Sequence, residues 1–469
     1  MDFAASFALV IPELLLSFTG LVLLLVAAFS GDTGARQIAI GAAAALFVAG
    51  FLLVPGLHTG SDGPATLAFG GLLKIDSFAL FAKALIYLSA IAALMIAPAF
   101  FAGPAAGAER GMRAEYPVLV IFAAVGMSIM VSANDFMSLY LGLELNSLSA
   151  YVLAAILRRD TRSGEAGLKY FVLGALASGI LLYGMSLLYG FTGGTGFSAV
   201  RAGLTGEMGT GALFGVIFVL SGLAFKISAV PFHMWTPDVY EGAPTPVTAF
   251  FATAPKVAAV ALTARVVFEV FGGQVAAWQQ IVMFMALASI IFGALGAIGQ
   301  ENLKRLLAYS SINNIGFILL GLAVANADGA SAMLVYLFIY VAMSLGSFVA
   351  LLMLRGEDGA LFETFADIRG LSVTQPAIAW ALLLFMFSLA GIPPLLGFYS
   401  KFVVFQATIE AGLVAFGAIA IAASVIGAFY YIKFVKVMFF DEPAGVVTGK
   451  SGAAHWVLLG LTGLIVSPL

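Results

Sequence analysis

The chain contains no cysteine and only three histidines, His58, His233 and His455, which are far apart. Without cysteine, neither a disulfide nor a cysteine-ligated iron–sulfur cluster can form, and the histidine spacing does not match that of zinc ligands. We therefore expect no metal and no redox cofactor in this chain. If the protein takes part in redox chemistry, the electrons must travel through other proteins.

Charged residues are scarce as well. They make up 10% of the 469 residues, and hydrophobic residues make up 62%, whereas a soluble globular chain carries about 25% charged residues. A soluble fold of this size cannot hide so much apolar surface from water. The 21 Lys and Arg against 24 Asp and Glu give no reason to expect a nucleic-acid partner. These proportions exclude a soluble enzyme and predict a chain embedded in the lipid bilayer.

Apolar runs long enough to cross a bilayer as helices recur along the whole chain. They predict an all-α polytopic membrane protein with about 14 transmembrane helices. We expect the first of them to be retained, because residues 1–25 show neither a basic region before the apolar stretch nor a small-residue cleavage site after it. The predicted spans are 8–30, 36–57, 76–101, 116–133, 135–157, 167–191, 211–235, 244–271, 277–299, 303–325, 330–354, 375–407, 411–440 and 453–469.

The basic residues in the loops and at the span ends next to them predict the orientation of these spans. The loops and span ends after odd-numbered spans contain fourteen of them, whereas those after even-numbered spans contain only Lys74 and Arg201. Because cytoplasmic loops are enriched in Lys and Arg, both termini are expected on the periplasmic side. The Ala- and Gly-rich composition suggests a bacterium, and hence its inner membrane. The fourteen residues are Arg36, Arg110, Arg113, Arg158, Arg159, Arg162, Lys169, Lys304, Arg305, Arg355, Arg369, Lys433, Lys436 and Lys450.

Five basic residues lie inside apolar runs instead. Lys83 and Arg265 are close to span ends, so we expect their side chains to reach the membrane interface. Lys226 and Lys256 lie near mid-membrane, and Lys401 lies within an apolar run of more than one span length. A charge at mid-membrane costs roughly 2.5–3.5 kcal/mol, so such residues usually face a hydrated interior and mark an ion path. The alternative is a structural lysine paired with backbone carbonyls.

Glu144 is the acidic counterpart of these lysines, near the middle of the fifth predicted span. The proton affinity of a buried lysine depends on whether a carboxylate is close, so moving or hydrating that carboxylate would move a proton. A lysine and a glutamate at this depth are the smallest set of groups that could form a proton relay. His233 could also relay protons near neutral pH, or it could be a hydrogen-bonded packing residue.

Prolines interrupt two of the predicted spans. Pro231 follows Lys226, and Pro393 and Pro394 precede Lys401. A proline removes helix hydrogen bonds, which lipid tolerates only beside a water-filled or protein-lined cavity. Broken helices are therefore expected near residues 226–235 and 391–401, and one lysine in each indicates duplicated ion sites.

A weak internal similarity supports this duplication. Residues 134–139 open the fifth span, residues 301–306 open the tenth, and a central lysine follows each at a similar distance. If the repeats contain five spans each, an odd number, the second is inverted relative to the first and each forms a half-channel. Chance similarity between apolar helices is the alternative. The predicted units are an N-terminal three-helix segment (1–115), a first repeat (116–271), a second repeat (277–440) and a C-terminal helix (441–469).

These motifs resemble the antiporter-like membrane subunits of respiratory complex I, from about the fourth span to the thirteenth. Within that family, residues 237–248 followed by Pro255 and Lys256 are similar to the N-type branch rather than the L or M type. The length also suits the N type, because the L type is expected to carry a long lateral helix at its C-terminus. The motifs are Glu144 with Ser147 and Tyr151, Lys226 with Pro231 to Trp235, Lys304 to Ile312, and Gly391 to Pro394.

The resemblance implies a proton-translocating subunit of an NADH:quinone oxidoreductase. Glu144 and Lys226 would form the input pair, Lys256 and Lys304 would pass protons along a central hydrated axis, and Lys401 would be the output-side donor. The translocase would carry out its redox chemistry elsewhere, with NADH, FMN, iron–sulfur clusters and quinone in partner subunits. Expected partners are M-type and K-type neighbours in the membrane arm, lipid and protons.

Two other functions remain open. A subunit of a multi-subunit cation/proton antiporter would share the same spans and lysines, and whether another cation is carried is not decided by the sequence. A structural subunit of the membrane arm would use its charges only to hold helices together.

Overall fold

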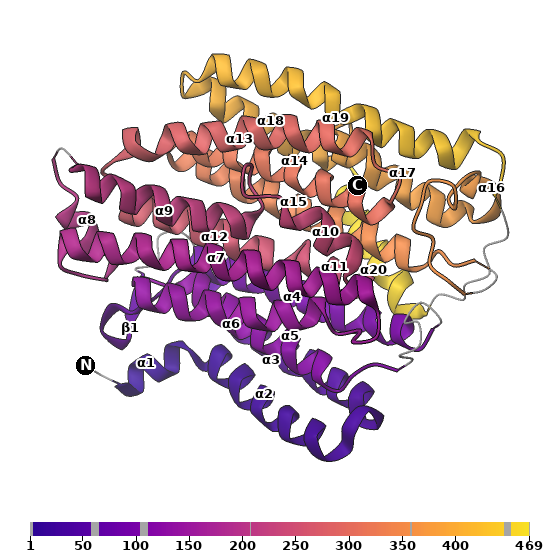
Figure 1. Ribbon diagram of the computed structural model, residues 1–469, viewed down its shortest axis with the longest axis horizontal. Coiled ribbons are helices and arrows are strands. Elements are labelled where there is room, and N and C mark those ends of the chain that lie inside the picture. The colour runs from indigo at the N-terminus through magenta and orange to yellow at the C-terminus, as the bar shows by residue number, and fades with distance from the viewer. Residues whose placement is uncertain are drawn as a thin grey trace.

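The structure, a computed structural model, describes residues 3–57, 65–103, 111–206, 208–356, 359–444 and 452–468. Long helices run roughly side by side, with α2 (Ile11–Ser30) and α3 (Ala35–Leu57) at one edge and α19 (Val414–Phe440) at the other (Figure 1). The prediction of an all-α polytopic membrane protein is confirmed. His58, Arg110 and Lys450 lie outside the described residues.

The first part of the chain forms membrane helices and one short hairpin. After α1 (Phe3–Leu9) and α2, the 3-10 turn η1 (Gly31–Gly34) leads into α3. Strands β1 (Thr66–Ala68) and β2 (Leu73–Ile75) flank η2 (Phe69–Gly71) and pair antiparallel, with Thr66 opposite Ile75. Helix α4 (Ser77–Phe101) then returns through the bundle.

The rest of the chain is helical with short connections. The middle part contains α5 (Glu115–Ser132), α6 (Phe136–Ala154), α7 (Thr161–Thr192), α8 (Phe197–Gly203), α9 (Thr210–Ile227), α10 (Trp235–Gly242), α11 (Thr245–Phe251), α12 (Ala254–Arg265) and the π-helical turn η4 (Val266–Val270). The last part contains α13 (Val275–Ile298), α14 (Leu303–Ala323), α15 (Ala327–Leu352), α16 (Leu371–Thr374), α17 (Pro376–Ala390), α18 (Leu396–Glu410), α19 and α20 (Ala453–Val466).

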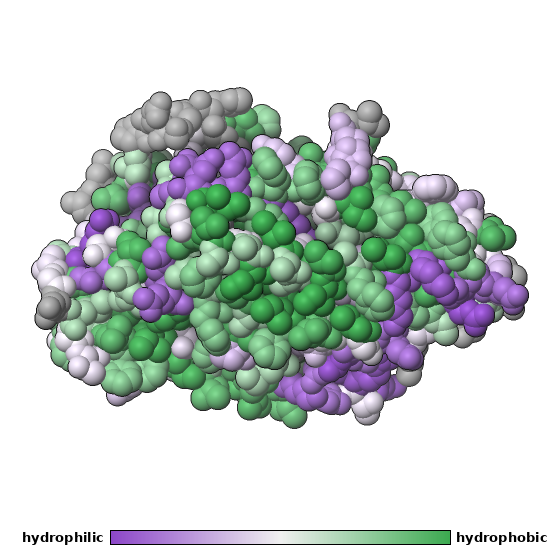
Figure 2. Space-filling model, turned by 90° about the horizontal axis from the view of Figure 1, so that it is seen from above, coloured by the Kyte–Doolittle hydropathy of each residue, from purple (hydrophilic) through white to green (hydrophobic). Residues whose placement is uncertain are grey.

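Each predicted span overlaps a helix or a pair of consecutive helices. The described residues contain ten helical stretches that are long and apolar enough to cross a membrane, and one of these, Ile11–Gly56, includes both α2 and α3. Pro376–Ala390 and Ala453–Val466 are shorter apolar helices. Figure 2 shows apolar side chains over much of the visible surface, with hydrophilic side chains gathered in patches, as a protein surrounded by lipid requires.

Side-chain caps explain where several helices begin. Each capping Asp or Asn accepts a hydrogen bond from a backbone N–H in the first turn, which would otherwise have no partner. This places the helix starts one residue after a polar side chain in an otherwise apolar sequence. The caps are Asp76 for α4, Asp135 for α6, Asp160 for α7, Asn302 for α14 and Asn326 for α15.

Both predicted helix breaks are present. Helix α9 ends at Ile227 and α10 begins at Trp235, with a cis bond between Val230 and Pro231. Helix α17 ends at Ala390 and α18 begins at Leu396, with a cis bond between Pro393 and Pro394. The predicted span 244–271 differs from expectation, because it is divided into α11, α12 and η4, with Pro255 in the first turn of α12.

The start of α6 and the start of α14 have the same surroundings. Around Asp135, the N–H of Phe136 donates to the carbonyl of Thr195, and the N–H of Phe197 donates to the carbonyl of Asn134. Around Asn302, the N–H groups of Leu303 and Phe365 donate to the carbonyls of Glu363 and Glu301 in the same pattern.

The helix packing next to these starts is also repeated. A Cβ added to Gly126 would lie 2.6 Å from the backbone nitrogen of Asn146, and one added to Gly293 would lie 2.6 Å from that of Asn313. Glycine therefore allows α5 to approach α6, and α13 to approach α14, at equivalent points. The two members of each pair are separated by the same number of residues.

Lys83 and Arg265, which were expected at the membrane interface, are held inside the protein by ion pairs. Both are buried, and Nζ of Lys83 lies 2.5 Å from Oε1 of Glu13. Arg265 makes paired contacts with Asp76 at 2.8 and 3.1 Å and a further contact with Glu269 at 2.7 Å. Carboxylates from other segments compensate both charges, so neither side chain needs to reach water.

Candidate functional site

Lys226 lies in the last turn of α9 and points to α6. Its Nζ donates to the hydroxyl of Ser147 at 2.8 Å and to the hydroxyl of Tyr151 at 3.4 Å. The same Nζ lies 5.8 Å from the centre of the Tyr151 ring. The structure therefore surrounds this lysine with hydroxyl groups that can both accept and donate protons.

Glu144 lies on α6, one turn before Ser147. It is half-buried, and its Oε1 is buried without a hydrogen-bond partner in the part of the chain that the structure describes. Lys226 donates to Ser147 and Tyr151 rather than to this carboxylate. Both charged groups therefore lie beside the same part of α6, and the Ser147 hydroxyl is the nearest hydrogen-bond acceptor of Lys226.

Lys256 lies in the first turn of α12 and is 1% exposed. Its Nζ donates to the carbonyl of Ile227 at 3.0 Å and to the hydroxyl of Ser228. These acceptors are at the C-terminal end of α9, where carbonyls lack helix partners and the helix dipole favours a cation. The break in α9 thus provides the binding site for this lysine.

Lys401 has an equivalent position at the second break. Its Nζ donates to the carbonyls of Leu389 and Ala390 at 3.1 and 3.0 Å, which end α17. It also lies 3.4 Å from the hydroxyl of Ser424 and 4.7 Å from the centre of the Phe317 ring. Lys256 and Lys401 therefore each bind the free carbonyls of a broken helix.

Glycine allows this approach at the second break. Gly391 has φ +83°, a conformation that side chains rarely adopt, and an added Cβ would lie 2.9 Å from Cδ of Lys401. A larger residue would strain the turn and push the lysine away from its carbonyls.

Lys304 and His233 complete the predicted set. Nζ of Lys304 donates at 3.0 Å to the carbonyl of Ala243, directly after α10. His233 lies in the break between α9 and α10, is half-buried, and has a buried Nδ1 without a hydrogen-bond partner among the described residues. The structure brings Lys226, Lys256 and His233 to the first break, while Lys304 lies at the far end of α10.

A charged cavity of about 220 Å³ is lined by Arg305, the residue after Lys304, and by charged residues of α7 and α10. Arg305 donates to Asp238 at 2.6 Å and to Glu241 at 3.0 Å, and Lys169 donates to Asp238 at 2.7 Å. Acidic and basic groups therefore alternate around the cavity. No group of three or more potential metal-ligating side chains is found in the described part of the chain.

The motif from Lys304 to Ile312 includes Ser310 and Ser311, but the sequence assigned no role to them or to Asn313 and Asn314, which follow in the same run. Ser310 lies 2.5 Å from the hydroxyl of Tyr431, and Asn314 accepts a hydrogen bond of 2.8 Å from Tyr336. These partners come from α19 and α15, so only the folded chain brings them together.

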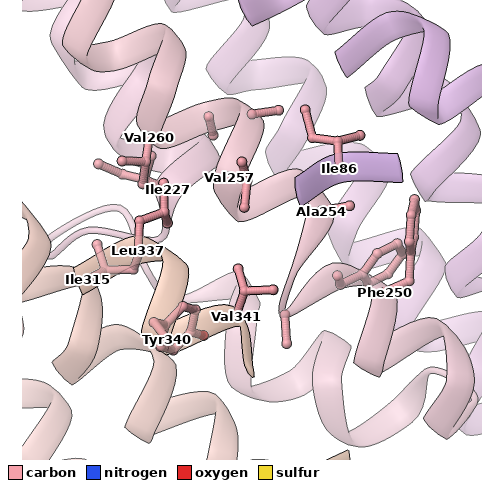
Figure 3. Close-up of a cluster of buried hydrophobic side chains, with 14 of the residues drawn as sticks. Ile86, Ile227, Phe250, Ala254, Val257, Val260, Ile315, Leu337, Tyr340 and Val341 are labelled. Carbon is pink, nitrogen blue, oxygen red and sulfur yellow. The ribbon is translucent and has the colours of Figure 1, made fainter. Parts of the chain in front are cut away.

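Apolar side chains fill the space between α12 and α15 (Figure 3). Val257 and Val260 of α12 lie toward Ile227 and Leu337, and Val341 lies near Tyr340. The helix that carries Lys256 therefore meets α15 through apolar side chains, not through a continuous row of charged groups.

Comparison with known proteins identifies the family of the chain. The chain is 68% identical over 469 residues to NADH-quinone oxidoreductase subunit N of Erythrobacter litoralis, covering 100% of this chain and 95% of that protein. Residues 133–427 match the family model described as "NADH:quinone oxidoreductase/Mrp antiporter, TM". The chain belongs to the subunit N branch of this antiporter family. The resemblance to antiporter-like subunits of complex I is thereby confirmed.

Solved structures agree with membership in the antiporter family. A chain of respiratory complex I from Thermus thermophilus with bound aureothin superposes with a TM-score of 0.81 at 31% identity, covering 97% of this chain and 96% of that one. A chain of the Mrp complex from Dietzia sp. superposes with a TM-score of 0.82 at 25% identity, covering 94% and 81%. The family match includes Glu144 and all four buried lysines of the predicted relay.

Proposed function

We propose that this chain is the N-type proton-translocating membrane subunit of an NADH:quinone oxidoreductase, the translocase of a respiratory complex. The observation that carries the proposal is the arrangement of Lys256 and Lys401 at two helix breaks, in a chain 68% identical to a subunit N. Burying a lysine within the membrane and breaking a membrane helix both cost free energy, and such features usually mark ion pathways.

In the proposed relay, Glu144 and Lys226 form the input pair. The Ser147 hydroxyl, 2.8 Å from Lys226, can pass a proton because it donates and accepts at the same oxygen. Oε1 of Glu144 has no hydrogen-bond partner among the described residues, so it can accept a proton from a neighbouring group or from water. Protonation of the carboxylate would remove the negative charge that favours a charged Lys226, and so release the lysine proton.

Lys256 and Lys304 carry the proton onward, with His233 as a possible participant at the first break. Each lysine is held by acceptors at a helix end, and these favour the protonated form. When a lysine loses its proton it also loses this favourable interaction, which draws a new proton to the site. Lys401, held in the same way by Leu389 and Ala390, is the proposed output-side donor.

The two half-channels are proposed to be inverted repeats, residues 116–271 and 277–440, between the N-terminal segment 1–115 and the C-terminal helix 441–469. The matching hydrogen bonds around Asp135 and Asn302, and the matching contacts of Gly126 and Gly293, support this division. With an odd number of spans in each unit, the half-channels would open to opposite sides.

The chain is a multi-pass membrane protein of a respiratory complex. We further propose that both termini lie on the periplasmic side, that M-type and K-type subunits are its neighbours, and that NADH, FMN, iron–sulfur clusters and quinone are bound by partner subunits. The absence of cysteine from the whole sequence supports this last point, because this chain offers no thiolate ligand for a cluster.

A subunit of a cation/proton antiporter is the second candidate, favoured by the superposition on a chain of an Mrp complex. Co-purification decides between the two. Isolation with a peripheral flavin and iron–sulfur arm supports the respiratory function, and isolation in a redox-free assembly supports the antiporter.

Substitution of the input pair tests the relay. We expect Lys226→Ala and Glu144→Ala to lower NADH-driven proton translocation in assembled complexes, whereas Lys433→Ala, which removes a lysine stacked on Phe365, should leave it unchanged. Normal translocation by both input-pair variants would reject the assignment. A defect in assembly alone would favour a purely structural role for these charges.

A further inference from the structure

Helix α14 carries a row of buried polar side chains that the proposed relay does not use. Ser310, Ser311, Asn313 and Asn314 are each at most 2% exposed, in the middle of a membrane helix. Burying such groups costs free energy unless each is hydrogen-bonded. In this structure all four side chains have hydrogen-bond partners, so the fold accommodates the row without leaving these groups unsatisfied.

The centre of the row is a hydroxyl pair between two helices. The oxygens of Ser310 on α14 and Tyr431 on α19 are 2.5 Å apart, and either can be the donor. Both side chains are buried. A hydroxyl can accept one proton while it releases another, so this pair can pass a proton without carrying a lasting charge.

Asn314 orients this pair. Its Oδ1 accepts from the hydroxyl of Tyr336 at 2.8 Å, which leaves its Nδ2 to donate to the hydroxyl oxygen of Tyr431 at 3.3 Å. The same Nδ2 also donates to the Ser310 carbonyl at 2.8 Å and lies 3.4 Å from the Ser310 hydroxyl. Both hydroxyls therefore accept from the amide, and the proton of each is available for the hydrogen bond between them. Asn314 and Tyr336 are therefore positioning residues, and Ser310 and Tyr431 are the groups that would touch the proton.

One end of the row leads to Lys401. Ser424 lies on α19 two turns before Tyr431 and accepts from Nζ of Lys401 at 3.4 Å. Phe317 lies on α14 one turn beyond Asn314, and its ring centre is 4.7 Å from the same Nζ. The facing sides of α14 and α19 thus connect the hydroxyl pair to the surroundings of the lysine.

The other end leads to Lys304. Lys304 and Ser311 lie two turns apart on α14, a rise of about 10 Å, and the Ser311 hydroxyl accepts from Tyr340 at 2.8 Å. After Arg305, α14 contains no charged side chain. Beyond Arg305, the polar side chains of α14 that lie toward Lys401 are therefore hydroxyls and amides.

We infer that the Ser310–Tyr431 hydroxyl pair, oriented by Asn314, carries the proton from the Lys304 end of α14 to Lys401. The inference rests on the proposed function, since it describes how a proton reaches Lys401. Ser310 takes up one proton and gives its own to Tyr431, which releases its hydroxyl proton toward Lys401. Each oxygen gains and loses one proton, and rotation of the hydroxyls restores the starting state. Water molecules complete the path on both sides of the pair.

The test removes single hydroxyls in the assembled complex and measures NADH-driven proton translocation. Because a positioned proton-transfer group contributes about 10²–10⁴-fold to a rate, we expect Tyr431→Phe and Ser310→Ala to lower translocation about tenfold or more. Ser310→Thr, which keeps the hydroxyl, should restore it relative to Ser310→Ala. The residual rate of Tyr431→Phe should also show a larger solvent deuterium effect than the unmodified complex.

Tyr87 and Ser128 provide a matched control. Their hydroxyls are 2.8 Å apart and both side chains are at most 1% exposed, on α4 and α5 outside the row. Tyr87→Phe should translocate normally. Equal losses from Tyr87→Phe and Tyr431→Phe, without a change in isotope effect, would overturn the inference in favour of a packing role.

Lys401→Arg separates the failure of this inference from failure of the proposed function. If Lys401→Arg abolishes translocation and Tyr431→Phe leaves it unchanged, the hydroxyl pair is not on the path, and the lysine relay stands. If both variants translocate normally, the proposed relay through Lys401 is wrong as well, and the inference is overturned with it.

Discussion

The buried pair of Lys83 and Glu13 gives a sharp prediction about stability. Nζ of Lys83 on α4 lies 2.5 Å from Oε1 of Glu13 on α2, and the two side chains are 1% and 9% exposed. Removing one partner of such a pair leaves an uncompensated buried charge and costs about 3–5 kcal/mol. Lys83→Met and Glu13→Leu should therefore each destabilise the protein by roughly that amount.

The double variant Glu13→Leu/Lys83→Met should be close to the unmodified protein. Replacing both charges by apolar residues of similar size removes the desolvation penalty together with the attraction, and is often neutral or stabilising by about 1–4 kcal/mol. The two substitutions are therefore expected to be strongly non-additive, with a coupling of several kcal/mol.

The free energies of unfolding of the four proteins (unmodified, two single variants and the double variant) can be measured by denaturant titration of the detergent-solubilised complex, followed by fluorescence. The exposed hydrogen bond between Gln406 and Glu410 on α18 is the control, and its removal should cost only about 1 kcal/mol or less. Should the double variant lose as much stability as the two single variants combined, the ion pair does not hold α2 against α4 and the reasoning is wrong.

Three other perturbations have defined outcomes. Burial alone would raise the pKa of Asp76, but the hydrogen bond and charge of Arg265 outweigh it and hold that pKa below its usual value. The stabilisation is complete above the unfolded pKa of about 3.9 and is lost as the pH falls through the folded value. The stability difference between the unmodified protein and Asp76→Asn, measured by unfolding as a function of pH, should thus be full near neutrality and vanish in acid; a constant difference would contradict the ion pair. Gly293→Ala places a Cβ 2.6 Å from the nitrogen of Asn313 and should destabilise by about 1–3 kcal/mol, whereas Gly299→Ala, which meets no atom within 4 Å, should not; equal stability of the two variants would refute the close approach of α13 and α14. Ser228→Gly is compatible with the local φ of 64° but removes the hydroxyl that accepts a hydrogen bond from Lys256. The free energy of unfolding, measured by thermal unfolding, should therefore fall by about 1–3 kcal/mol. An unchanged value would mean that this hydroxyl does not hold the lysine.

The sequence predicted the membrane helices and two of their breaks because these features depend on local composition. Apolar runs mark the spans, and Pro231, Pro393 and Pro394 mark the breaks. The division of the predicted span 244–271 was missed, although Pro255 was visible, because a proline in the first turn of a helix is compatible with helix geometry. Whether a proline bends a helix, begins one or separates two depends on the packing around it.

Interactions between distant segments were beyond the reach of sequence patterns. Lys83 is compensated by Glu13, which belongs to another helix, so its distance from a span end said nothing about its environment. The partners Ser310 and Tyr431 are separated by 121 residues. Similarly, the sequence placed Glu144 and Lys226 at a similar depth, but only the folded chain shows Ser147 and Tyr151 as the hydrogen-bond acceptors of the lysine.

The central claim is that protons move through the buried lysines of this chain. Its most direct test is the number of protons translocated per NADH oxidised by the assembled complex with Lys401→Arg. Arginine keeps the positive charge at the carbonyls of Leu389 and Ala390 but cannot release a proton at accessible pH. If Lys401 donates protons, this ratio falls while the complex still assembles; an unchanged ratio would mean that protons do not pass through this lysine.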